Sequence, residues 1–329
     1  MTIILGIEST AHTFGIGVVK NGEVLSNVKD NFTTEKGGLI PMEVAKHHEE
    51  VWESVYENAI DEAKINVKDI EAVAFSNAPG LSPCLVAGKK IAKKIAGDLK
   101  VPLVEVNHCV AHLEIGKVVG AKDPVMLYAS GANTQIIAYA AGKYRVFGET
   151  LDRGVGNFID TFARYAGLGF PGGPKIAELA LKSKEENYIE LPYSIKGMDV
   201  AFSGMLTKLR QMLESGKYKL EDLSFSLQET TFAMLVEASE RAMAHTGKKE
   251  LLIGGGVGCN KRLQEMCEIM CKQRGAKFFC PPNSLLVDNA GMIAYLGEIM
   301  FKAGVFEKDL EKVDIAPRER TDDIDVVWK

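Results

Sequence analysis

The sequence predicts an α/β protein built from two similar lobes. The chain has 329 residues, of which 46% are hydrophobic, and this length favours two lobes over one. Strand-like and helix-like runs occur in balance, together with 32 glycines, as in α/β proteins. A third observation is that one arrangement of strands, turns and helix occurs once in each half of the chain.

In the first half, residues 3–26 read IILGIESTAHTFGIGVVKNGEVLS. We interpret this segment as an apolar strand, a polar turn, a second strand, a turn at Asn21-Gly22 and a third strand, because Asn-Gly is a strong hairpin signal. From residue 71, the sequence EAVAFSNAPGLSPCLVAGKKIAKKIAGDL predicts a strand, a Pro/Gly loop and a helix.

The second half repeats both parts. Residues 125–148, VMLYASGANTQIIAYAAGKYRVFG, predict three strands with the second turn at Ala141-Gly142. From residue 249, KELLIGGGVGCNKRLQEMCEIMCKQRG predicts a strand, a loop and a helix. A duplicated chain of this kind predicts two lobes that face each other, with a ligand site in the cleft between them.

Between the halves, residues 104–116 read VEVNHCVAHLEIG. His108 and His112 are four residues apart, so a helix would place both imidazoles on one face, as half of a metal site. A zinc protease of the H-E-x-x-H type needs a Glu directly after the first His, and here that residue is Cys109. A metal at this site would therefore need another role.

Two further residues could complete a metal site. Asp288 stands in LLVDNAGMIAY, where LLV suggests the end of a strand and NAGMIAYLGEIM a helix, so that Asp288 would be the N-cap. Tyr128 ends the strand VMLY, directly before the turn ASGAN. A cap alone and an ordinary strand aromatic are the alternative interpretations of these two residues.

The glycine-rich turns suggest an anion site. Four glycines between 254 and 258 precede Asn260, which we expect to begin a helix, and GLGFPGGPKIAEL, residues 167–179, opens another. The first turns of the two repeats carry residues that could hold phosphates: Ser9, Thr10, Ser130, Gly131, Asn133 and Thr134. No P-loop or Rossmann motif is present. Tight turns alone could explain any one loop, but their number favours a nucleotide.

Composition limits the classes of partner. The net charge is −5, from 39 basic and 44 acidic residues, which argues against a protein that wraps nucleic acid alone. The densest basic cluster lies in KKIAKK, residues 89–94, where a solvated helix face is the alternative to nucleic-acid contact. We find neither a signal peptide nor a run of 18 apolar residues, and therefore expect a cytoplasmic protein without membrane contact.

The six cysteines fit a reduced chain. A zinc site is conceivable from four of them, but no C-x-x-C pair supports it; these are Cys259, Cys267, Cys271 and Cys280. The adjacent His47 and His48 point to different sides of a helix and are interpreted as residues at the surface or behind a site.

Several motifs together resemble one family. In order along the chain they are GIESTAHTFGIGV, NHCVAHLEIG, YASGANTQI, DRGVGNFIDTFAR, GFPGGP, GGGVGCN and VDNAGMIA. The chain resembles the universal tRNA threonylcarbamoyladenosine-synthesis family, formerly named for a glycoprotease activity. The tail RERTDDIDVVWK resembles the archaeal and eukaryotic branch, the catalytic subunit of the KEOPS complex.

The resemblance implies a duplicated actin-like ATPase (ASKHA) fold. Residues 1–122, completed by 290–329, would form the first lobe and residues 123–289 the second. The implied reaction moves threonylcarbamoyl from threonylcarbamoyl-AMP to N6 of the adenosine 3′ of the anticodon, in tRNAs that read codons beginning with A. The implied partners are tRNA and KEOPS-like subunits, among them a small atypical protein kinase.

The resemblance also assigns residues. One iron per subunit, with zinc as the alternative, would be held by His108, His112, Tyr128 and Asp288. ATP or threonylcarbamoyl-AMP would be bound by Tyr128, Ala129, Ser130, Gly131, Ala132, Asp160, Gly173 and Asn260. Contacts behind the ligands or to phosphate would come from Ser9, Thr10, His12, Asn133 and Thr134. Such a metal can polarise a carbonyl or phosphate oxygen as a Lewis acid, which explains why no Glu is needed at position 109.

The chain departs from the family pattern at two places. Ala132 stands where the family usually has a second Gly, and Ala177 stands where archaeal relatives often have an acid, here displaced to Glu178. Three alternatives to the transferase stay open at this point. They are a metalloprotease, a kinase-like enzyme with Asp160 as catalytic base, and a non-enzymatic ATP-binding assembly module.

Overall fold

The computed structural model describes residues 2–34 and 39–329. The chain forms two compact units. The first unit contains residues 1–120, 142–144 and 281–329, and the second contains residues 121–141 and 145–280. The sequence placed residues 281–289 with the second lobe, whereas in the structure they pack with the first unit.

The first unit is built on a five-stranded mixed sheet of order β3-β2-β1-β4-β5. Its strands are β1 (Ile3–Glu8), β2 (Thr13–Lys20), β3 (Glu23–Asn31), β4 (Ala72–Ala78) and β5 (Leu103–Asn107). Strands β1 to β3 form an antiparallel meander, and β4 and β5 continue the sheet in parallel with β1. The central strands are buried along their whole length, as continuous apolar runs in α/β sheets are.

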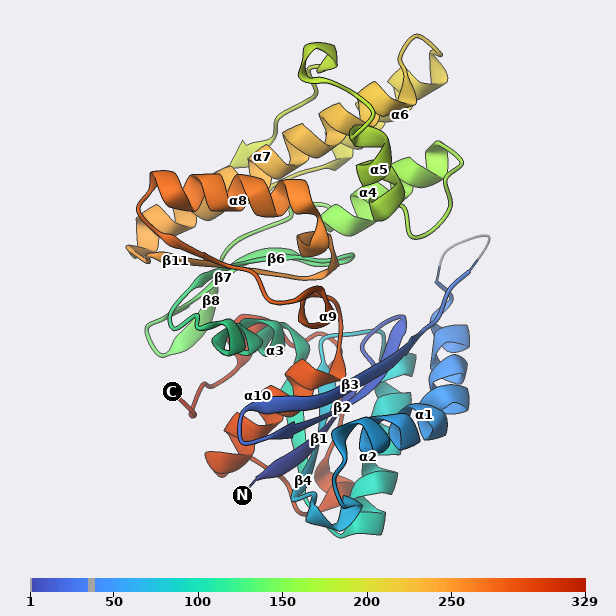
Figure 1. Cartoon of the computed structure of the whole chain (residues 1–329), viewed down its shortest axis with the longest axis vertical. Helices are drawn as coiled ribbons and strands as arrows, with labels where there is room; N and C mark the ends of the chain where they lie inside the picture. Colours follow the sequence, from blue (N-terminus) through green and yellow to red (C-terminus); the bar gives the residue numbers. More distant parts are fainter. Residues whose placement is uncertain (1, 35–38) are drawn as a thin grey trace. The chain divides into compact units, whose positions relative to one another are not determined.

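Helices cover both faces of this sheet (Figure 1). One face is covered by α1 (Pro41–Ala63) and α2 (Ser82–Leu99), and the other by α10 (Ala290–Lys302); the unit also contains α3 (His108–Glu114) and α9 (Asn283–Leu286). Ile3, Leu5 and Ile7 of β1 point into a core shared with α1 and α2. Gly6, on the opposite face, lies so close to the backbone of α10 that a Cβ would collide with Ala294. Glycine on this face therefore lets α10 pack directly against the strand.

The second unit repeats the sheet in the order β12-β11-β6-β7-β8. Its strands are β6 (Val125–Ala129), β7 (Thr134–Ala140), β8 (Lys143–Glu149), β11 (Glu250–Gly254) and β12 (Lys277–Phe279). Here β6 pairs with β7 antiparallel and with β11 in parallel, as β1 does with β2 and β4. The two sheets thus have one connectivity, which confirms the duplication predicted from the sequence.

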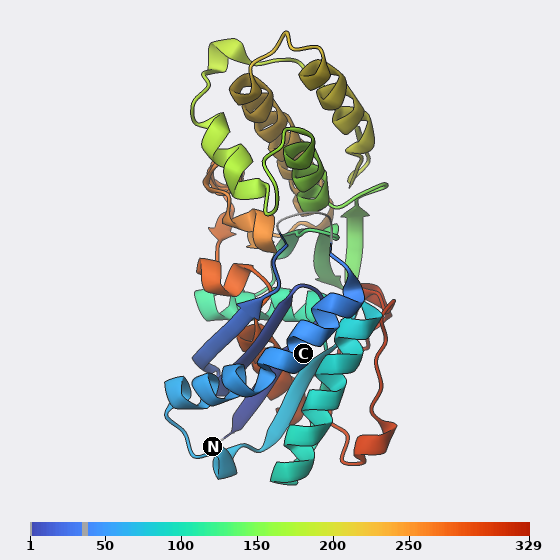
Figure 2. The same cartoon turned by 90° about the vertical axis from the view of Figure 1, so that its right-hand side faces the viewer.

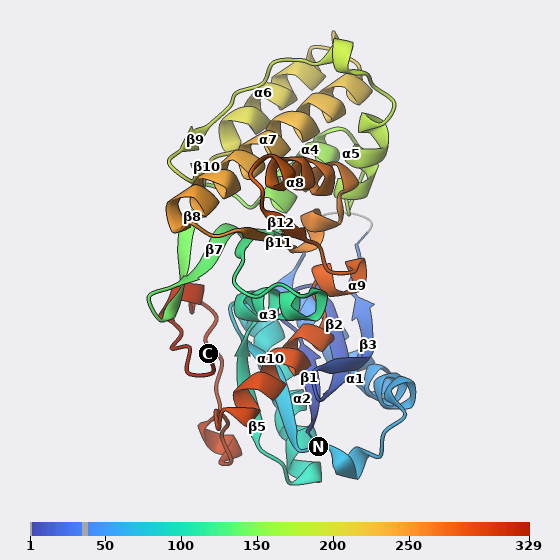
Figure 3. The same ribbon diagram turned by 60° about the vertical axis from the view of Figure 1, so that its left-hand side comes forward.

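Five helices gather on one side of the second sheet (Figures 2 and 3). They are α4 (Val155–Tyr165), α5 (Gly173–Ala180), α6 (Ser203–Glu214), α7 (Leu220–Thr246) and α8 (Lys261–Gln273). Two short strands, β9 (Ile195–Lys196) and β10 (Asp199–Val200), form a separate hairpin. Single 3₁₀ turns complete the described chain at 67–69, 115–119, 185–187, 256–259, 310–312 and 321–323.

The two predicted hairpin turns have the same backbone form. Asn21 and Gly22 both have positive φ, at 50° and 83°, and Ala141 and Gly142 repeat this at 51° and 81°. Two consecutive positive φ values match the right-handed twist of the flanking strands in a two-residue hairpin. Ala141 adopts this conformation although alanine seldom does, so the repeat preserves the turn without preserving the residue.

One predicted element is wrong. Residues 285–287 were interpreted as the end of a strand, but the chain forms the short helix α9 at Asn283–Leu286. Pro282 directly precedes this helix, and a short apolar run such as SLLV does not by its periodicity distinguish a strand from a buried helical turn. Within the described residues, no helix is both long enough and apolar enough to cross a membrane.

Candidate metal centre

The histidine pair lies on α3, as its spacing predicts. Strand β5 ends at Asn107, whose side chain accepts hydrogen bonds from the backbone amides of Cys109 (3.0 Å) and Val110 (3.3 Å) and so caps the helix. His108 is the first helical residue and His112 stands one turn later. Both are buried, and their ring centroids are 4.8 Å apart.

Asp288 reaches the pair from the connection between α9 and α10. The N-cap of α10 is Asn289, whose Oδ1 accepts from the amide of Met292 at 2.9 Å. The prediction that Asp288 itself caps this helix is therefore wrong by one residue. Because Asn289 performs the capping, the Asp288 carboxylate is directed toward α3 instead.

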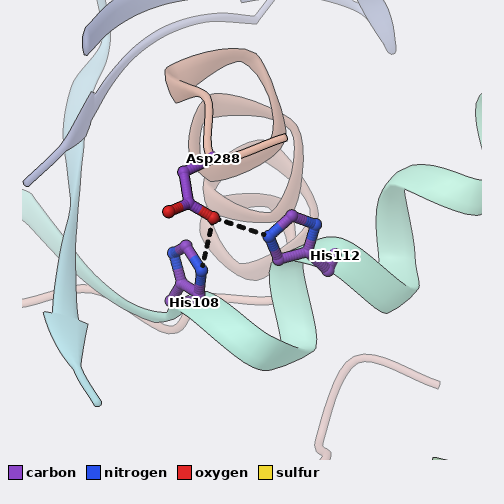
Figure 4. A group of neighbouring side chains, drawn as sticks. All are labelled: His108, His112 and Asp288. Atoms are coloured by element: carbon purple, nitrogen blue, oxygen red, sulfur yellow. Dashed lines mark hydrogen bonds and ion pairs between the residues drawn. The ribbon is translucent and has the colours of Figure 1, made fainter. Parts of the chain in front are cut away.

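The three side chains converge on one point (Figure 4). Oδ1 of Asp288 lies 3.3 Å from Nε2 of His108 and 3.4 Å from Nε2 of His112. All three donor atoms lie within 4.8 Å of one another. The structure thus brings together three of the four residues expected to bind metal.

Behind His108 stands a carboxylate that the sequence reading missed. Oε2 of Glu8, the last residue of β1, lies 2.9 Å from Nδ1 of His108. The other oxygen of Glu8 accepts from the amide of Thr10 (2.8 Å) and from its hydroxyl (2.5 Å). The available signal was an acidic residue ending an otherwise apolar strand, within the motif GIEST.

The surroundings of the three side chains shift their pKa values in different directions. Burial by itself lowers the pKa of His108, but the Glu8 and Asp288 carboxylates outweigh it and hold that pKa well above 6.5. Burial lowers the pKa of His112. Burial by itself would raise the pKa of Asp288, but the two histidines hold it well below 3.8. In the absence of a metal, these shifts favour a protonated His108, a neutral His112 and an ionised Asp288.

The donor set fits a divalent transition metal. Glu8 binds Nδ1 of His108, which leaves Nε2 to act as a ligand, and a carboxylate behind a ligating imidazole is the usual arrangement in metalloproteins. Two imidazoles and one carboxylate suit iron or zinc better than magnesium or calcium, which prefer oxygen ligands. In the part of the chain that the structure describes, this is the group of His, Cys, Asp and Glu side chains assembled closely enough for a metal.

The fourth expected ligand, Tyr128, belongs to the second unit. It lies in β6, directly before the turn formed by residues 129–133, and is 1% exposed. In that turn, the hydroxyl of Ser130 donates to the Asn133 carbonyl at 3.0 Å and accepts from the Asn133 amide at 3.1 Å. Oγ1 of Thr134 accepts from the amide of Val155 at 2.7 Å, which ties the turn to the first residue of α4.

The glycines around this turn separate into two kinds. Gly154, Gly156 and Gly255 press against its backbone, and a Cβ at any of them would collide with residues 129–132. Their role is close packing of one loop on another. In contrast, a Cβ at Gly131 would meet nothing nearer than 3.6 Å, and one at Gly173 nothing within 4 Å. Close packing therefore explains why the first three positions are glycine, but it does not explain the glycines at 131 and 173.

The remaining expected nucleotide residues have structural partners. Oδ1 of Asp160 accepts from the amide of Gly172 at 2.8 Å, so it helps to shape the loop before α5. Asn260 is the N-cap of α8, as predicted, and accepts from the amide of Arg262 at 2.9 Å. Its Nδ2 donates to Gln228 at 2.9 Å.

The residues in and near the turn between β1 and β2 differ in their burial and hydrogen bonds. Ser9 is fully buried, its amide donates to Ser76, and its hydroxyl occupies the space that a side chain at position 88 would need. His12 is half-buried, and its carbonyl accepts from the amide of Phe32. His48 is fully buried on α1, contrary to the surface interpretation, and donates from Nε2 to the Ala11 carbonyl at 2.9 Å.

The lysine run on α2 is mostly neutralised by acidic partners. Lys89 pairs with Asp314 at 2.7 Å and Lys90 with Glu49 at 3.0 Å. Lys94 lies 3.7 Å from Asp98. This pairing favours the solvated-face interpretation over a nucleic-acid patch. Burial raises the pKa of Cys267 and, to about 11, that of Cys271, which disfavours the thiolates that zinc needs.

Comparison with known proteins decides the family. The model of the family described as tRNA N6-adenosine threonylcarbamoyltransferase matches residues 23–295. A protein of that name from Thermococcus sibiricus is 53% identical over 326 residues, covering 99% of this chain and all of the relative. The chain belongs to the tRNA N6-adenosine threonylcarbamoyltransferase family. The resemblance seen in the motifs, and with it a transferase, is confirmed.

The family extends across distant organisms and longer chains. The threonylcarbamoyltransferase of Danio rerio is 47% identical over the full length of both proteins. A probable bifunctional tRNA threonylcarbamoyladenosine biosynthesis protein of Methanosarcina mazei is 50% identical, and this chain covers 60% of it. In that relative, therefore, the threonylcarbamoyltransferase region is one part of a longer protein.

Solved structures confirm the actin-like ATPase fold. HypF from T. kodakarensis has a TM-score of 0.64 at 15% identity, over 94% of this chain and 48% of HypF. The activator of 2-hydroxyisocaproyl-CoA dehydratase from Clostridium difficile has a TM-score of 0.55 at 12% identity, over 96% and 98% of the two chains. At these identities the likeness concerns the fold alone.

Proposed function

We propose that this chain transfers threonylcarbamoyl from threonylcarbamoyl-AMP to N6 of the adenosine 3′ of the anticodon, in tRNAs that read codons beginning with A. N6 attacks the carbamoyl carbon, the bond from that carbon to the phosphate oxygen breaks, AMP leaves, and N6 loses a proton. Family membership supports the reaction class. The convergence of His108, His112 and Asp288 is the observation that supports its site.

His108, His112 and Asp288 would hold one metal ion per chain. When bound, the metal supplies a Lewis acid for a carbonyl or phosphate oxygen of the donor. Glu8 orients the His108 ring by accepting from Nδ1, and Thr10 holds Glu8 in turn. The exocyclic amine of adenine is a weak nucleophile, so orientation and electrophile activation are the contributions that matter most.

We propose iron as this metal, with zinc as the alternative. Two histidines and one carboxylate are a ligand set typical of non-haem iron. Tyr128 is proposed as the fourth ligand, because a phenolate suits a ferric ion and the family resemblance assigns it there. Its phenol would then give a coloured complex, whereas a zinc complex of the same ligands would be colourless.

The nucleotide part of the donor is proposed to bind at the turn 129–132, together with Asp160, Gly173 and Asn260. Supporting this are the open spaces beside Gly131 and Gly173, which packing does not explain. Ala132 is exposed, so its methyl, where the family usually has glycine, is compatible with the turn itself. Asp160 is the candidate general base that accepts the proton lost from N6, and the sequence motifs offer no stronger candidate.

The proposed partners are tRNA and KEOPS-like subunits, including a small atypical protein kinase. The bifunctional relatives support a second activity beside this one, because this chain accounts for 60% of their length. The paired lysines of α2 give no strong site for phosphates, so we assign most tRNA affinity to partner subunits. Such an enzyme would work in the cytoplasm, where its tRNA substrate is found.

The experiment is to incubate the purified chain with threonylcarbamoyl-AMP and tRNA, with and without partner subunits, and to analyse the nucleosides by mass spectrometry. We expect threonylcarbamoyladenosine in tRNAs that read codons beginning with A. Release of peptides from a protein substrate, or phosphorylation of a small molecule, would favour the protease or the kinase-like alternative. Nucleotide binding without any product, even with all partners present, would favour the assembly module.

A further inference from the structure

The C-terminal tail, residues 318–329, contacts α3 at both of its ends. Oε2 of Glu319 accepts from Nδ2 of Asn107, the N-cap of the helix, at 3.1 Å. Thr321, which is 2% exposed, interacts with the thiol of Cys109. Nε1 of Trp328 donates to Glu114, the last residue of the helix, at 3.3 Å. The tail therefore reaches the beginning, the first turn and the end of the helix that carries both histidines.

The contact at Asn107 determines which way its side-chain amide points. Oδ1 faces the amides of Cys109 and Val110, and Nδ2 faces Glu319. If the amide rotated by 180°, two N–H donors would face each other at the helix and two oxygens would face each other at Glu319. A carboxylate accepts hydrogen bonds from the amide group, so Glu319 and the two helix amides together disfavour the rotated state.

The Asn107 amide and Glu319 border a cavity. The cavity has a volume of about 270 Å³, and its lining also contains apolar residues that include Val110 and Leu296. A cavity of this size with polar lining can hold water, which could replace one of the partners of the amide. The orientation of the cap is thus set by its hydrogen bonds, and the Glu319 bond is the one supplied from outside the helix.

We propose that Glu319 is a positioning residue for the metal centre, acting through Asn107 on α3. By fixing the cap, it fixes the first turn of the helix and with it the ring of His108, the first helical residue. The role in metal binding rests on the proposed function, whereas the effect on α3 does not depend on a metal.

Two readouts test this proposal. The first is hydrogen exchange of the Cys109 and Val110 amides in the metal-free chain, followed in Glu319→Ala and Glu319→Gln. Gln retains an acceptor oxygen and should restore the bond. Glu311→Ala is the matched control, because Glu311 is an exposed acid in the segment directly before the tail. The second readout is the affinity of each chain for Co²⁺, measured by its visible absorption.

Glu319→Ala should exchange both amides about five-fold faster and bind Co²⁺ about five-fold more weakly, as expected for the loss of one helix cap. Glu319→Gln and Glu311→Ala should resemble the parent chain. Unchanged exchange in Glu319→Ala would overturn the proposal. Faster exchange with unchanged Co²⁺ affinity would overturn its link to the metal. If the parent chain bound no Co²⁺, the metal site of the proposed function would fail, and amide exchange would still decide the role of Glu319.

If Glu319→Ala unfolded, Trp328→Phe offers a milder test at the other end of α3. It retains an aromatic ring, although a smaller one, and removes the indole N–H that donates to Glu114. Faster exchange of the amides in the last turn of α3 would support positioning by the tail, and unchanged exchange there would overturn it.

Discussion

Oε2 of Glu8 lies 2.9 Å from Nδ1 of His108, which joins the end of β1 to the beginning of α3. The two residues are 100 positions apart in the sequence, and both are buried. The bond fixes the orientation of the His108 ring, and it leaves Nε2 directed toward Asp288. The proposed metal centre is therefore supported from the central strand of the first sheet.

Removing this support should weaken metal binding while leaving the ligands in place. We expect Glu8→Ala to lower the affinity for Fe²⁺ or Zn²⁺ by about 10- to 100-fold, the usual loss when a carboxylate behind a ligating histidine is removed. Competition with a chelator would measure this affinity. Glu23→Ala, an exposed acid at the start of β3, is the control. Parent-like affinity in Glu8→Ala would show that Glu8 has no such role.

Two substitutions of Asn260 distinguish its role as a helix cap from its proposed contact with the nucleotide. Asn260→Ala should lower the free energy of unfolding by about 1 kcal/mol, because the N-cap of α8 is lost. Asn260→Asp retains the capping oxygen and removes only the amide that donates to Gln228. Calorimetry with an adenylate analogue then reports the ligand contact in a chain with an intact cap. If Asn260→Asp bound the analogue as tightly as the parent does, the nucleotide would make no contact with this amide.

The burial of His48 predicts that the folded protein loses stability in mild acid. Burial lowers its pKa to about 4, with His47 and His12 adding to the effect and the Ala11 carbonyl and Glu8 opposing it. A histidine whose folded pKa is depressed takes up its proton more readily when unfolded. Its stabilising contribution is therefore fully present above pH 6.5 and is lost as the pH falls toward 4. The loss should be about 3 kcal/mol.

Urea unfolding between pH 4 and 7.5 measures this effect as the difference between the parent chain and His48→Leu. The variant should lose less stability over this range, because it has no proton to take up at this position. His245→Leu, at an exposed histidine near the end of α7, serves as the comparison. Parallel curves for the parent and His48→Leu would contradict the prediction.

The lysines of α2 should contribute little to tRNA binding. Three of the four already pair with Glu49, Asp98 and Asp314, so few free cationic groups face the solvent there. Replacing Lys89, Lys90, Lys93 and Lys94 with glutamine should change the tRNA affinity of the assembled complex by less than about three-fold. Filter binding at several salt concentrations checks this. A marked drop in the salt dependence would instead identify α2 as a phosphate-binding surface.

Local sequence patterns were sufficient to predict much of the fold. The repeat of three strands followed by strand, loop and helix was visible because each turn kept its Gly residue, and the two sheets share one strand order. The i, i+4 spacing of His108 and His112 was also informative, because it depends only on the geometry of one helix. The error at 285–287 arose where an apolar run was too short to show a period.

Contacts between distant segments were not predictable in the same way. Glu8, Glu319 and Trp328 reach α3 from positions about 100 to 214 residues away in the sequence, and no spacing rule connects them. Asp288 was found as a candidate, but its neighbour Asn289 proved to be the cap, because either residue type can occupy that position. The pairing of the lysines likewise depends on distant acids, Glu49 of α1 and Asp314 near the C-terminal tail.

The most direct measurement of the central claim is the rate of threonylcarbamoyl transfer as a function of metal content. The metal-free chain, assembled with its partners, would be given increasing amounts of iron, as Fe²⁺ or as Fe³⁺, and assayed with threonylcarbamoyl-AMP and tRNA. We predict that the rate rises with the first additions and becomes constant at one metal per chain, whereas His112→Ala, folded by circular dichroism, stays inactive at every addition. Full activity in the metal-free chain, or in metal-free His112→Ala, would contradict the account.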